Sequence, residues 1–201
     1  MPQYFDPETA AASAPRQVEL SLRDLKRSVT LTTDRGVFSG DRIDPGTSVL
    51  ISHGPPLARH GDLLDLGCGY GPLAVAMALR APSARVWAVD VNERAVALCA
   101  RNAEALGLGP ERLRACTPEE VPYSVRFAAL WSNPPIRIGN AALHQLLLTW
   151  LGRLDEAGQA VLVVQRHLGA DSLAVWLGQQ GFVVERLAAK RGYRLLGVCQ
   201  S

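Results

Sequence analysis

The chain has 201 residues, of which 48% are hydrophobic and 20% are charged, and its formal net charge at pH 7 is +2. This length fits one α/β domain with a short additional segment, and the hydrophobic fraction is sufficient for a buried core. The polar first residues exclude a signal peptide, and no apolar run approaches the roughly 20 residues that span a membrane. The four cysteines form no CxxC pair or zinc-ligand pattern, which predicts a reduced, cytoplasmic protein without a metal site.

Two alternating stretches near the N-terminus predict a β-hairpin. Residues 18–22 and 28–32 alternate between apolar and polar side chains, and residues 23–27 lie between them. Further along, Asp44-Pro45-Gly46-Thr47 indicates a turn that leads into the apolar residues 49–51. We therefore expect an N-terminal arm and hairpin over residues 1–45 and the main domain over residues 46–201.

From residue 61 onward, strand and helix patterns alternate. This alternation predicts a doubly wound, mostly parallel seven-stranded sheet, with the hairpin as a short N-terminal β extension. Ligands of such sheets bind beyond the carboxyl ends of the strands. The expected strands are 63–66, 84–89, 113–116, 127–132, 160–164, 182–187 and 193–199, and the expected helices are 72–80, 93–106 after an Asn92 cap, 141–154 and 171–180.

A glycine-rich stretch, Asp65-Leu66-Gly67-Cys68-Gly69-Tyr70-Gly71, follows the strand expected at 63–66. Glycines permit positive φ and leave no Cβ between the backbone and a ligand, and the helix that follows presents free N–H groups. The third glycine comes one residue earlier than in the G-x-G-x-x-G fingerprint of nicotinamide enzymes. Asp65 also suits a ligand with a cationic end better than it suits a pyrophosphate.

Asp90 ends the strand expected at 84–89, about twenty residues after the glycine stretch, where a carboxylate can accept hydrogen bonds from a ribose diol. Asn133-Pro134-Pro135-Ile136 ends the strand expected at 127–132. Its two prolines fix φ and remove two N–H donors, so the Asn133 side-chain oxygen and the Pro134 carbonyl are presented as acceptors. Two fixed acceptors can bind both protons of an exocyclic NH2 group and direct its nitrogen lone pair at an electrophile.

The motifs DLGCGYG, VDVN and SNPPI, in this order, resemble those of class I S-adenosylmethionine-dependent methyltransferases. The longer stretches TDRGVFS, DRIDPGT, NPPIRIG, LVVQRHLGADSL and GYRLL resemble the small-domain methyltransferases related to the 16S ribosomal RNA guanine-N2 enzymes. The resemblance covers nearly the whole chain from about residue 18. It implies a Rossmann-like methyltransferase fold and a reaction that yields S-adenosylhomocysteine.

The resemblance also implies roles for individual residues. Asn133, Pro134, Pro135 and Ile136 would hold the target amine and its ring. The implied cofactor-binding residues are Asp65, Gly67, Cys68, Gly69, Gly71, Asp90, Val91, Asn92, Cys116, Thr117 and Asn133, with Phe38 closing over the pocket. Three positions depart from many relatives, which have an acidic residue at Thr117, an Asp at Ala128 and an aromatic residue at Ile136.

Basic residues in or beside expected loops are candidates for contacts with RNA phosphates, because a base must leave the stack before chemistry can occur on it. Arg137, Arg35 and Arg166 are the main candidates, with further ones at Lys26-Arg27, Arg42, His167, Lys190-Arg191 and Arg194. The expected function is methylation of the exocyclic amine of a guanine in ribosomal RNA or a ribosomal particle. The alternatives are methylation of a protein glutamine amide or an adenine amine, a cofactor-binding module without catalysis, and a nicotinamide oxidoreductase.

Overall fold

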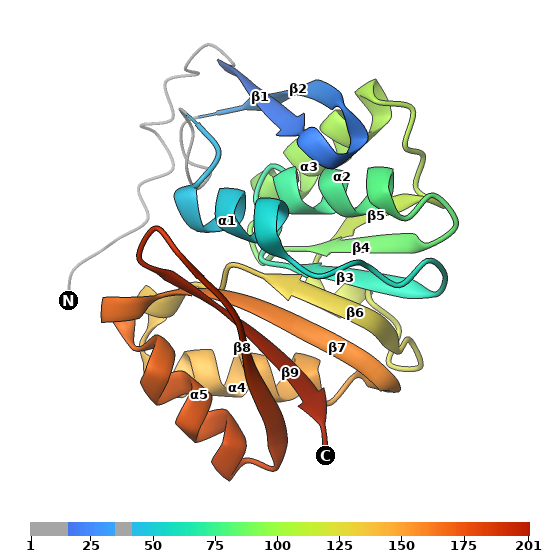
Figure 1. The fold of residues 1–201 in the computed structure, drawn as a ribbon. Helices are drawn as coiled ribbons and strands as arrows, with labels where there is room; N and C mark the ends of the chain where they lie inside the picture. Colours follow the sequence, from blue (N-terminus) through green and yellow to red (C-terminus); the bar gives the residue numbers. More distant parts are fainter. Residues whose placement is uncertain (1–15, 35–41) are drawn as a thin grey trace, which may run out of the picture.

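The computed structural model describes residues 16–34 and 42–201 (Figure 1). An N-terminal hairpin is followed by a long alternation of strands and helices. The strands are β1 (Arg16–Leu22), β2 (Arg27–Thr33), β3 (Asp62–Leu66), β4 (Arg85–Val89), β5 (Leu113–Cys116), β6 (Phe127–Ser132), β7 (Leu154–Gln165), β8 (Phe182–Lys190) and β9 (Tyr193–Gln200). The helices are α1 (Pro45–His53), α2 (Pro72–Arg80), α3 (Glu93–Ala105), α4 (Asn140–Leu151) and α5 (Ala170–Gln179), with short 3-10 turns η1 (Arg23–Leu25), η2 (Pro118–Glu120), η3 (Ile136–Ile138) and η4 (Arg166–Leu168).

The main sheet has seven strands in the order β5-β4-β3-β6-β7-β9-β8. The five strands from β5 to β7 are parallel, and β9 runs antiparallel to both β7 and β8. The order reverses between β3 and β6, so the carboxyl ends of these neighbours border the place where open α/β sheets bind ligands. The predicted doubly wound, mostly parallel sheet is confirmed.

Helices cover both faces of this sheet (Figure 1). Helices α1, α2 and α3 lie on one face together with the hairpin, and α4 and α5 lie on the other. Each face has its own apolar cluster, centred on Met77 and Trp131 on the hairpin side and on Phe127 and Trp150 on the opposite side. Because both faces are covered, the central strands are almost wholly apolar, as they are in β6 and the middle of β7.

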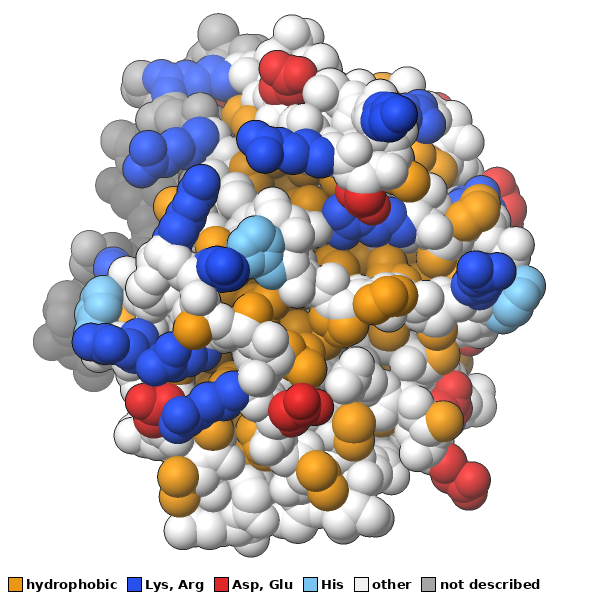
Figure 2. Space-filling model, viewed as in Figure 1, with side chains coloured by type: hydrophobic (Ala, Val, Ile, Leu, Met, Phe, Trp, Pro, Cys, Tyr) orange, Lys and Arg blue, Asp and Glu red, His pale blue; other side chains and the backbone are white. Residues whose placement is uncertain are grey.

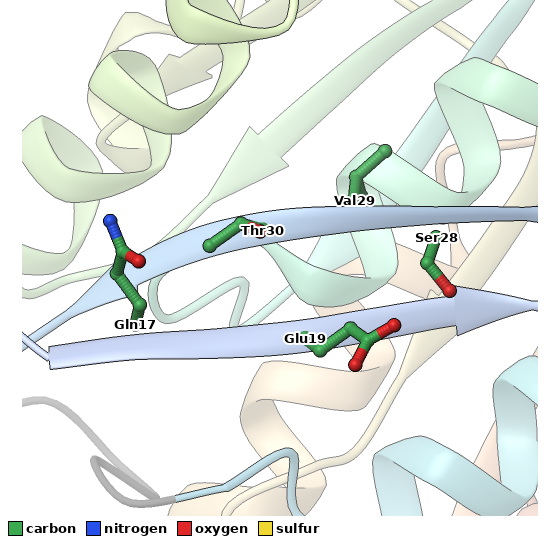
Figure 3. Close-up of a pocket in the computed structure, with 5 residues that line it drawn as sticks. All are labelled: Gln17, Glu19, Ser28, Val29 and Thr30. Carbon is green, nitrogen blue, oxygen red and sulfur yellow. The ribbon is translucent and has the colours of Figure 1, made fainter.

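The predicted hairpin forms from β1 and β2, which pair in register from Arg16 with Thr33 to Leu22 with Arg27. Its buried side chains alternate along each strand, and Figure 3 shows Val29 and Ser28 on opposite sides of β2. A shallow hollow of about 270 Å³ on the hairpin is lined by Gln17, Glu19, Ser28, Val29 and Thr30 (Figure 3). None of these five residues lies at the carboxyl edge of the main sheet, so we assign no function to this hollow.

Asn102 of α3 joins the hairpin to the glycine-rich stretch. Its side chain is buried, accepts from the Thr32 backbone N–H at 2.8 Å and donates to the carbonyl oxygens of Thr32 and Tyr70, each at 2.8 Å. Arg80, at the end of α2, forms a two-pronged pair with Asp24 of η1. Polar side chains therefore fix the hairpin at both of its ends.

Two expectations about local structure were wrong. Residues 44–47 do not form an isolated turn but begin α1: the Asp44 carboxylate accepts the Thr47 N–H at 3.0 Å, and Pro45 occupies the first helical position, where no N–H is needed. Leu154 is buried as the first residue of β7 rather than the last of α4, because Gly152 ends that helix. The proposed division at residue 45 stays a prediction.

Candidate active site

The carboxyl ends of four neighbouring parallel strands bring the candidate residues together. In the sheet register, Leu66 of β3 pairs with Val89 of β4 and with Ser132 of β6, and Val89 pairs with Cys116 of β5. The buried Ser132 hydroxyl donates to the Leu66 carbonyl at 2.7 Å, which ties two of these strand ends together. The glycine-rich stretch, Asp90, Cys116 and Asn133 therefore lie along one edge, as the sequence predicts.

The glycine-rich loop needs its glycines for two different reasons. Gly67, Gly69 and Gly71 all have positive φ, at +79°, +55° and +95°, where other residues are strained. A Cβ on Gly71 would lie 2.6 Å from Cys99 Sγ, so the loop packs tightly against α3 there. A Cβ on Gly67 would meet nothing within 4 Å, which leaves open space on the ligand side of the loop.

The Asp65 carboxylate is wholly buried, and only one of its two oxygens accepts a hydrogen bond from the described residues. Its Oδ2 accepts the Ala74 N–H of α2 at 2.8 Å, whereas its Oδ1 has no hydrogen-bond partner among the described residues. Burial, and to a smaller extent the charge of Asp90, raises the pKa of this carboxyl to about 8, against the lowering effect of the Ala74 N–H. The buried Tyr70 hydroxyl, in the same loop, likewise lacks a partner within the described part of the chain. Both atoms therefore keep a hydrogen-bonding capacity that no described residue uses.

Asp90 fastens the glycine-rich loop to the start of α3. Its Oδ2 accepts the Gly69 N–H and its Oδ1 accepts the Asn92 N–H, each at 2.9 Å. Each carboxylate oxygen has a further lone pair, so these contacts leave Asp90 able to accept hydroxyl groups. Asn92 caps α3 by accepting the Arg94 N–H, and Val91 beside it is 80% exposed.

The carboxyl end of β5 lies beside Asp90 at the same edge of the sheet. The Cys116 carbonyl accepts the Asp90 N–H at 3.3 Å, and burial, with a contribution from Glu120, raises the pKa of the Cys116 thiol to about 11. Glu120 accepts both the Thr117 N–H and the Thr117 hydroxyl, at 2.8 Å and 3.2 Å. An acidic side chain thus lies beside Thr117, held there by the cap of η2, although Thr117 itself is not acidic.

The amide of Asn133 is held by residues at the start of α1. Its Nδ2 donates to Asp44 Oδ2 at 2.7 Å and to the Thr47 hydroxyl at 3.2 Å. A carboxylate can only accept, so the NH2 group must face Asp44 and the amide oxygen must face away from it. No hydrogen bond to that oxygen comes from the described residues.

Because Gly46 has no side chain, the start of α1 can lie close to both Asn133 and Tyr193. A Cβ there would lie 2.9 Å from the Tyr193 ring, 3.0 Å from Asp44 Oδ2 and 3.3 Å from Asn133 Oδ1. Burial and the nearby Asp44 charge raise the pKa of Tyr193, and the same two causes raise the pKa of Tyr70 to about 12. The start of α1 therefore contacts Asn133 and the start of β9, and the charge of Asp44 also acts on Tyr70 in the glycine-rich loop.

Pro134, Pro135 and Ile136 form a tight turn after Asn133. Pro135 has φ −75° and ψ 76°, and the Ile136 N–H donates to the Pro134 carbonyl at 2.8 Å, which is an inverse γ-turn. The Pro134 carbonyl keeps a second lone pair for another donor. Ile136 is half-buried against the apolar cluster of α4 and α5, so only part of its side chain is available to a substrate.

The basic candidates are spread around this edge. Arg137 is exposed in η3, directly after the Asn133 turn. The Arg166 N–H donates to the Gly192 carbonyl at 2.8 Å, which places η4 beside the turn between β8 and β9. Arg35 and Phe38 lie outside the described residues.

A cofactor with a cationic amino acid end and a ribose fits these residues. The free Asp65 oxygen suits an ammonium group, Asp90 suits a ribose diol, and the open space at Gly67 lets a ligand approach the backbone. Residues 16–34 and 42–201 hold no group of three His, Cys, Asp or Glu side chains placed to bind a metal ion. No helix in the same residues is long and apolar enough to cross a membrane.

Comparison with known proteins decides the family. The sequence model of the methyltransferase small domain matches residues 28–197. The chain belongs to this family. It is an S-adenosylmethionine-dependent methyltransferase, and the resemblance noted in the sequence and the expected cofactor are confirmed.

The relatives of this methyltransferase include enzymes named for ribosomal RNA. Ribosomal RNA small subunit methyltransferase C of Shewanella sp. MR-4 is 31% identical over 76% of this chain and 45% of its own length. The uncharacterized protein YbxB of Bacillus subtilis 168 is 30% identical over 98% of both chains. Among solved structures, the 16S rRNA N2 G1207 methyltransferase RsmC of T. thermophilus, in complex with AdoMet and guanosine, matches with a TM-score of 0.77 and 26% identity. That match covers 94% of this chain and 51% of the other, so this methyltransferase spans about half the length of RsmC.

Proposed function

We propose that this methyltransferase transfers a methyl group to the exocyclic N2 amine of a guanine in ribosomal RNA. The observation that carries the proposal is the orientation of the Asn133 amide, whose NH2 group is held by Asp44 and Thr47. Its oxygen is thereby left as an acceptor, and the carbonyl of the following residue, Pro134, has a second lone pair beside the Ile136 N–H contact. An amine with two N–H donors is the group that such a pair of acceptors binds.

The chain's own residues would bind and orient the amine. Asn133 Oδ1 and the Pro134 carbonyl would each accept one N–H, so the nitrogen is held in one direction without a covalent step. The bound cofactor supplies a methyl group on a sulfonium, which is the electrophile that this nitrogen needs. The contact of Ile136 with the ring plane would be apolar only.

We further propose that the cofactor is held by the loops at the carboxyl edge of the sheet. Asp65 and Tyr70 have unsatisfied atoms for its polar end, and Asp90 has free lone pairs for its ribose. The exposed Val91 would lie against the adenine. The remaining proposed contacts are Gly67, Cys68, Gly69, Gly71, Asn92, Cys116 and Thr117.

The choice of guanine in ribosomal RNA rests on the relatives. RsmC is described as an N2 methyltransferase of 16S rRNA and was solved with guanosine, and other relatives carry ribosomal RNA names. The rival substrates are a glutamine amide of a protein and an adenine amine, which also present planar NH2 groups to the same two acceptors. Ile136 is half-buried and has no aromatic ring, so stacking on this side chain cannot distinguish among these substrates.

The test is to incubate the protein with labelled cofactor and either total RNA or total protein, and to analyse the modified RNA by mass spectrometry. We expect label in ribosomal RNA as N2-methylguanosine. Asn133→Ala should abolish transfer and leave the calorimetric affinity for the cofactor within about threefold of wild type, since the lost contacts belong to the amine. Label in protein alone, or full transfer by Asn133→Ala, would overturn the proposal.

A further inference from the structure

A second feature of the molecule lies beside the candidate active site, on the side of the hairpin. A groove of about 1140 Å³ runs between β1 with η1, the second half of α1 with the segment that follows it, and the turn between β8 and β9. We call it the hairpin groove. Buried apolar side chains of α1, among them Val49 and Ile51, contribute to its lining.

The lining of the hairpin groove is strongly basic. It includes six Lys or Arg residues and two acidic ones, whereas the whole chain has a net charge of only +2. One of the acidic residues, Asp24, is already paired with Arg80, whose hydrogen bonds lower the pKa of that carboxyl. Figure 2 shows Lys and Arg side chains gathered over the hairpin and the neighbouring left side of this face. The lining of the hairpin groove therefore carries an excess of positive charge.

Four of these cations are available to a ligand. Arg23, Arg59, Lys190 and Arg191 are exposed, and none of them forms an ion pair with an acidic side chain of the described residues. They come from three separate segments, so the fold and not a local charge run assembles them. Convergence of unpaired cations on one groove is typical of a surface that binds a polyanion.

The groove leads to the residues that hold Asn133. Ile43 lines the groove and precedes Asp44, and Ser48 lines it and follows Thr47. On the opposite wall, Arg191 lines the groove two residues before Tyr193, whose ring lies against Gly46. The lining of the groove therefore borders the residues around Asn133 on two segments of the chain, the start of α1 and the turn before β9.

We propose that the hairpin groove binds the single-stranded RNA that flanks the target nucleotide, through its phosphates. This inference rests on the proposed function and adds the path of the substrate. Apart from the His53 ring, the described lining contains no aromatic side chain on which bases could stack. Recognition in the groove is thus electrostatic and independent of sequence, and selection of the base belongs to the Asn133 loop.

The proposal makes a quantitative prediction for salt dependence. Each phosphate neutralised on single-stranded nucleic acid contributes roughly −0.7 to the slope of log affinity against log salt concentration, so four contacts give a slope of about −3. Removing two of the cations should make the slope shallower by about 1.4 and weaken binding about tenfold at physiological salt. The probe is a fluorescein-labelled, unstructured oligoribonucleotide.

The variant Arg59→Gln/Lys190→Gln removes two groove cations, and Arg101→Gln/Arg126→Gln removes two exposed cations that do not line the groove. We expect the groove variant alone to lose affinity and salt slope, to show a raised KM for ribosomal RNA with unchanged kcat, and to retain wild-type melting temperature and cofactor affinity. Equal slopes and KM values in the two variants, with wild type methylating RNA, would overturn the groove assignment alone. Wild type that binds the probe but labels no RNA would instead overturn the proposed function. A wild-type dimer in sedimentation that the groove variant dissociates would assign the groove to a second copy and overturn the proposal.

Discussion

Asn133 and Asp44 lie 89 residues apart in the sequence, and the Asn133 side-chain amide donates to Asp44 Oδ2 at 2.7 Å. The same carboxylate oxygen accepts the Thr47 N–H, so the cap of α1 and the orientation of the Asn133 amide depend on one atom. This contact decides which end of the amide faces Asp44, and under the proposed function it also decides which end would face the substrate.

Asp44→Asn tests whether the orientation matters. Asparagine caps helices about as well as aspartate, so the stability of α1 should change little. The substituted side chain would offer either its NH2 group or its oxygen to Asn133. The Asn133 amide could then pair in either of its two orientations, and neither would be preferred. A charge-assisted hydrogen bond contributes about 1.5–3 kcal/mol, so kcat should fall roughly tenfold to a hundredfold while cofactor affinity stays the same. Single-turnover transfer rates measure this, and an unchanged rate would show that Asp44 serves only as a cap.

Gly67→Ala tests the open space on the ligand side of the glycine-rich loop. Gly107, in the turn after α3, provides the matched control, because both glycines have positive φ and a Cβ on either would meet nothing within 4 Å. Both alanine variants should lose about 1–2 kcal/mol of stability from the left-handed backbone. Only Gly67→Ala should lose affinity for S-adenosylmethionine, measured by calorimetry. Equal cofactor affinity in the two variants would place the cofactor away from Gly67.

The buried Asp65 predicts a particular pH dependence. Its pKa of about 8 in the folded protein lies above its value of 3.8 in the absence of burial, so between these values the folded chain keeps a proton that the unfolded chain has lost. The contribution of Asp65 to the free energy of unfolding therefore decreases as pH rises from about 4 to about 8, and is constant above that.

Melting curves of cofactor-free wild type and Asp65→Asn, from about pH 5 to about pH 8.5, should show this extra decline in wild type only. A cationic ligand favours the ionised carboxylate, so wild-type affinity for the cofactor should rise with pH over the upper part of the same range and that of Asp65→Asn should not. Parallel pH profiles for the two proteins, in either measurement, would contradict the assignment of Asp65.

Much of the fold is predictable from the sequence because the signals are local. The bounds of β5, β6 and α2 match their expected ranges, since each is a short apolar or helical run between turn residues. The turn expected at residues 44–47 is wrong because Asp-Pro-Gly-Thr is compatible with both a turn and a capped helix start, and only the packing of α1 decides between them. The expected end of the helix at Leu154 is wrong because Leu154 is apolar and fits the spacing of the buried helix residues. It would be buried in either element, so its side chain alone does not show that α4 has already ended.

The edge of the sheet is also predictable, since parallel strands place their carboxyl ends together. What the sequence could not indicate is the second group of residues around Asn133. Asp44, Gly46 and Tyr193 are separated from it by long stretches of chain, and their proximity depends on where α1 and β9 pack. An Asp before Pro and a Thr three residues later is a recognisable helix start, but nothing local says which side chain that start will meet.

Asn102 gives the hairpin an influence on the cofactor loop. One side chain holds the Thr32 backbone of the hairpin and the Tyr70 carbonyl of the glycine-rich loop at the same time. A displacement of either segment therefore acts on the hydrogen bonds of the other. If RNA binds at the hairpin and the cofactor at the glycine-rich loop, as proposed above, each must alter the binding free energy of the other by the same amount. One buried amide would thus carry the coupling between the two proposed binding sites.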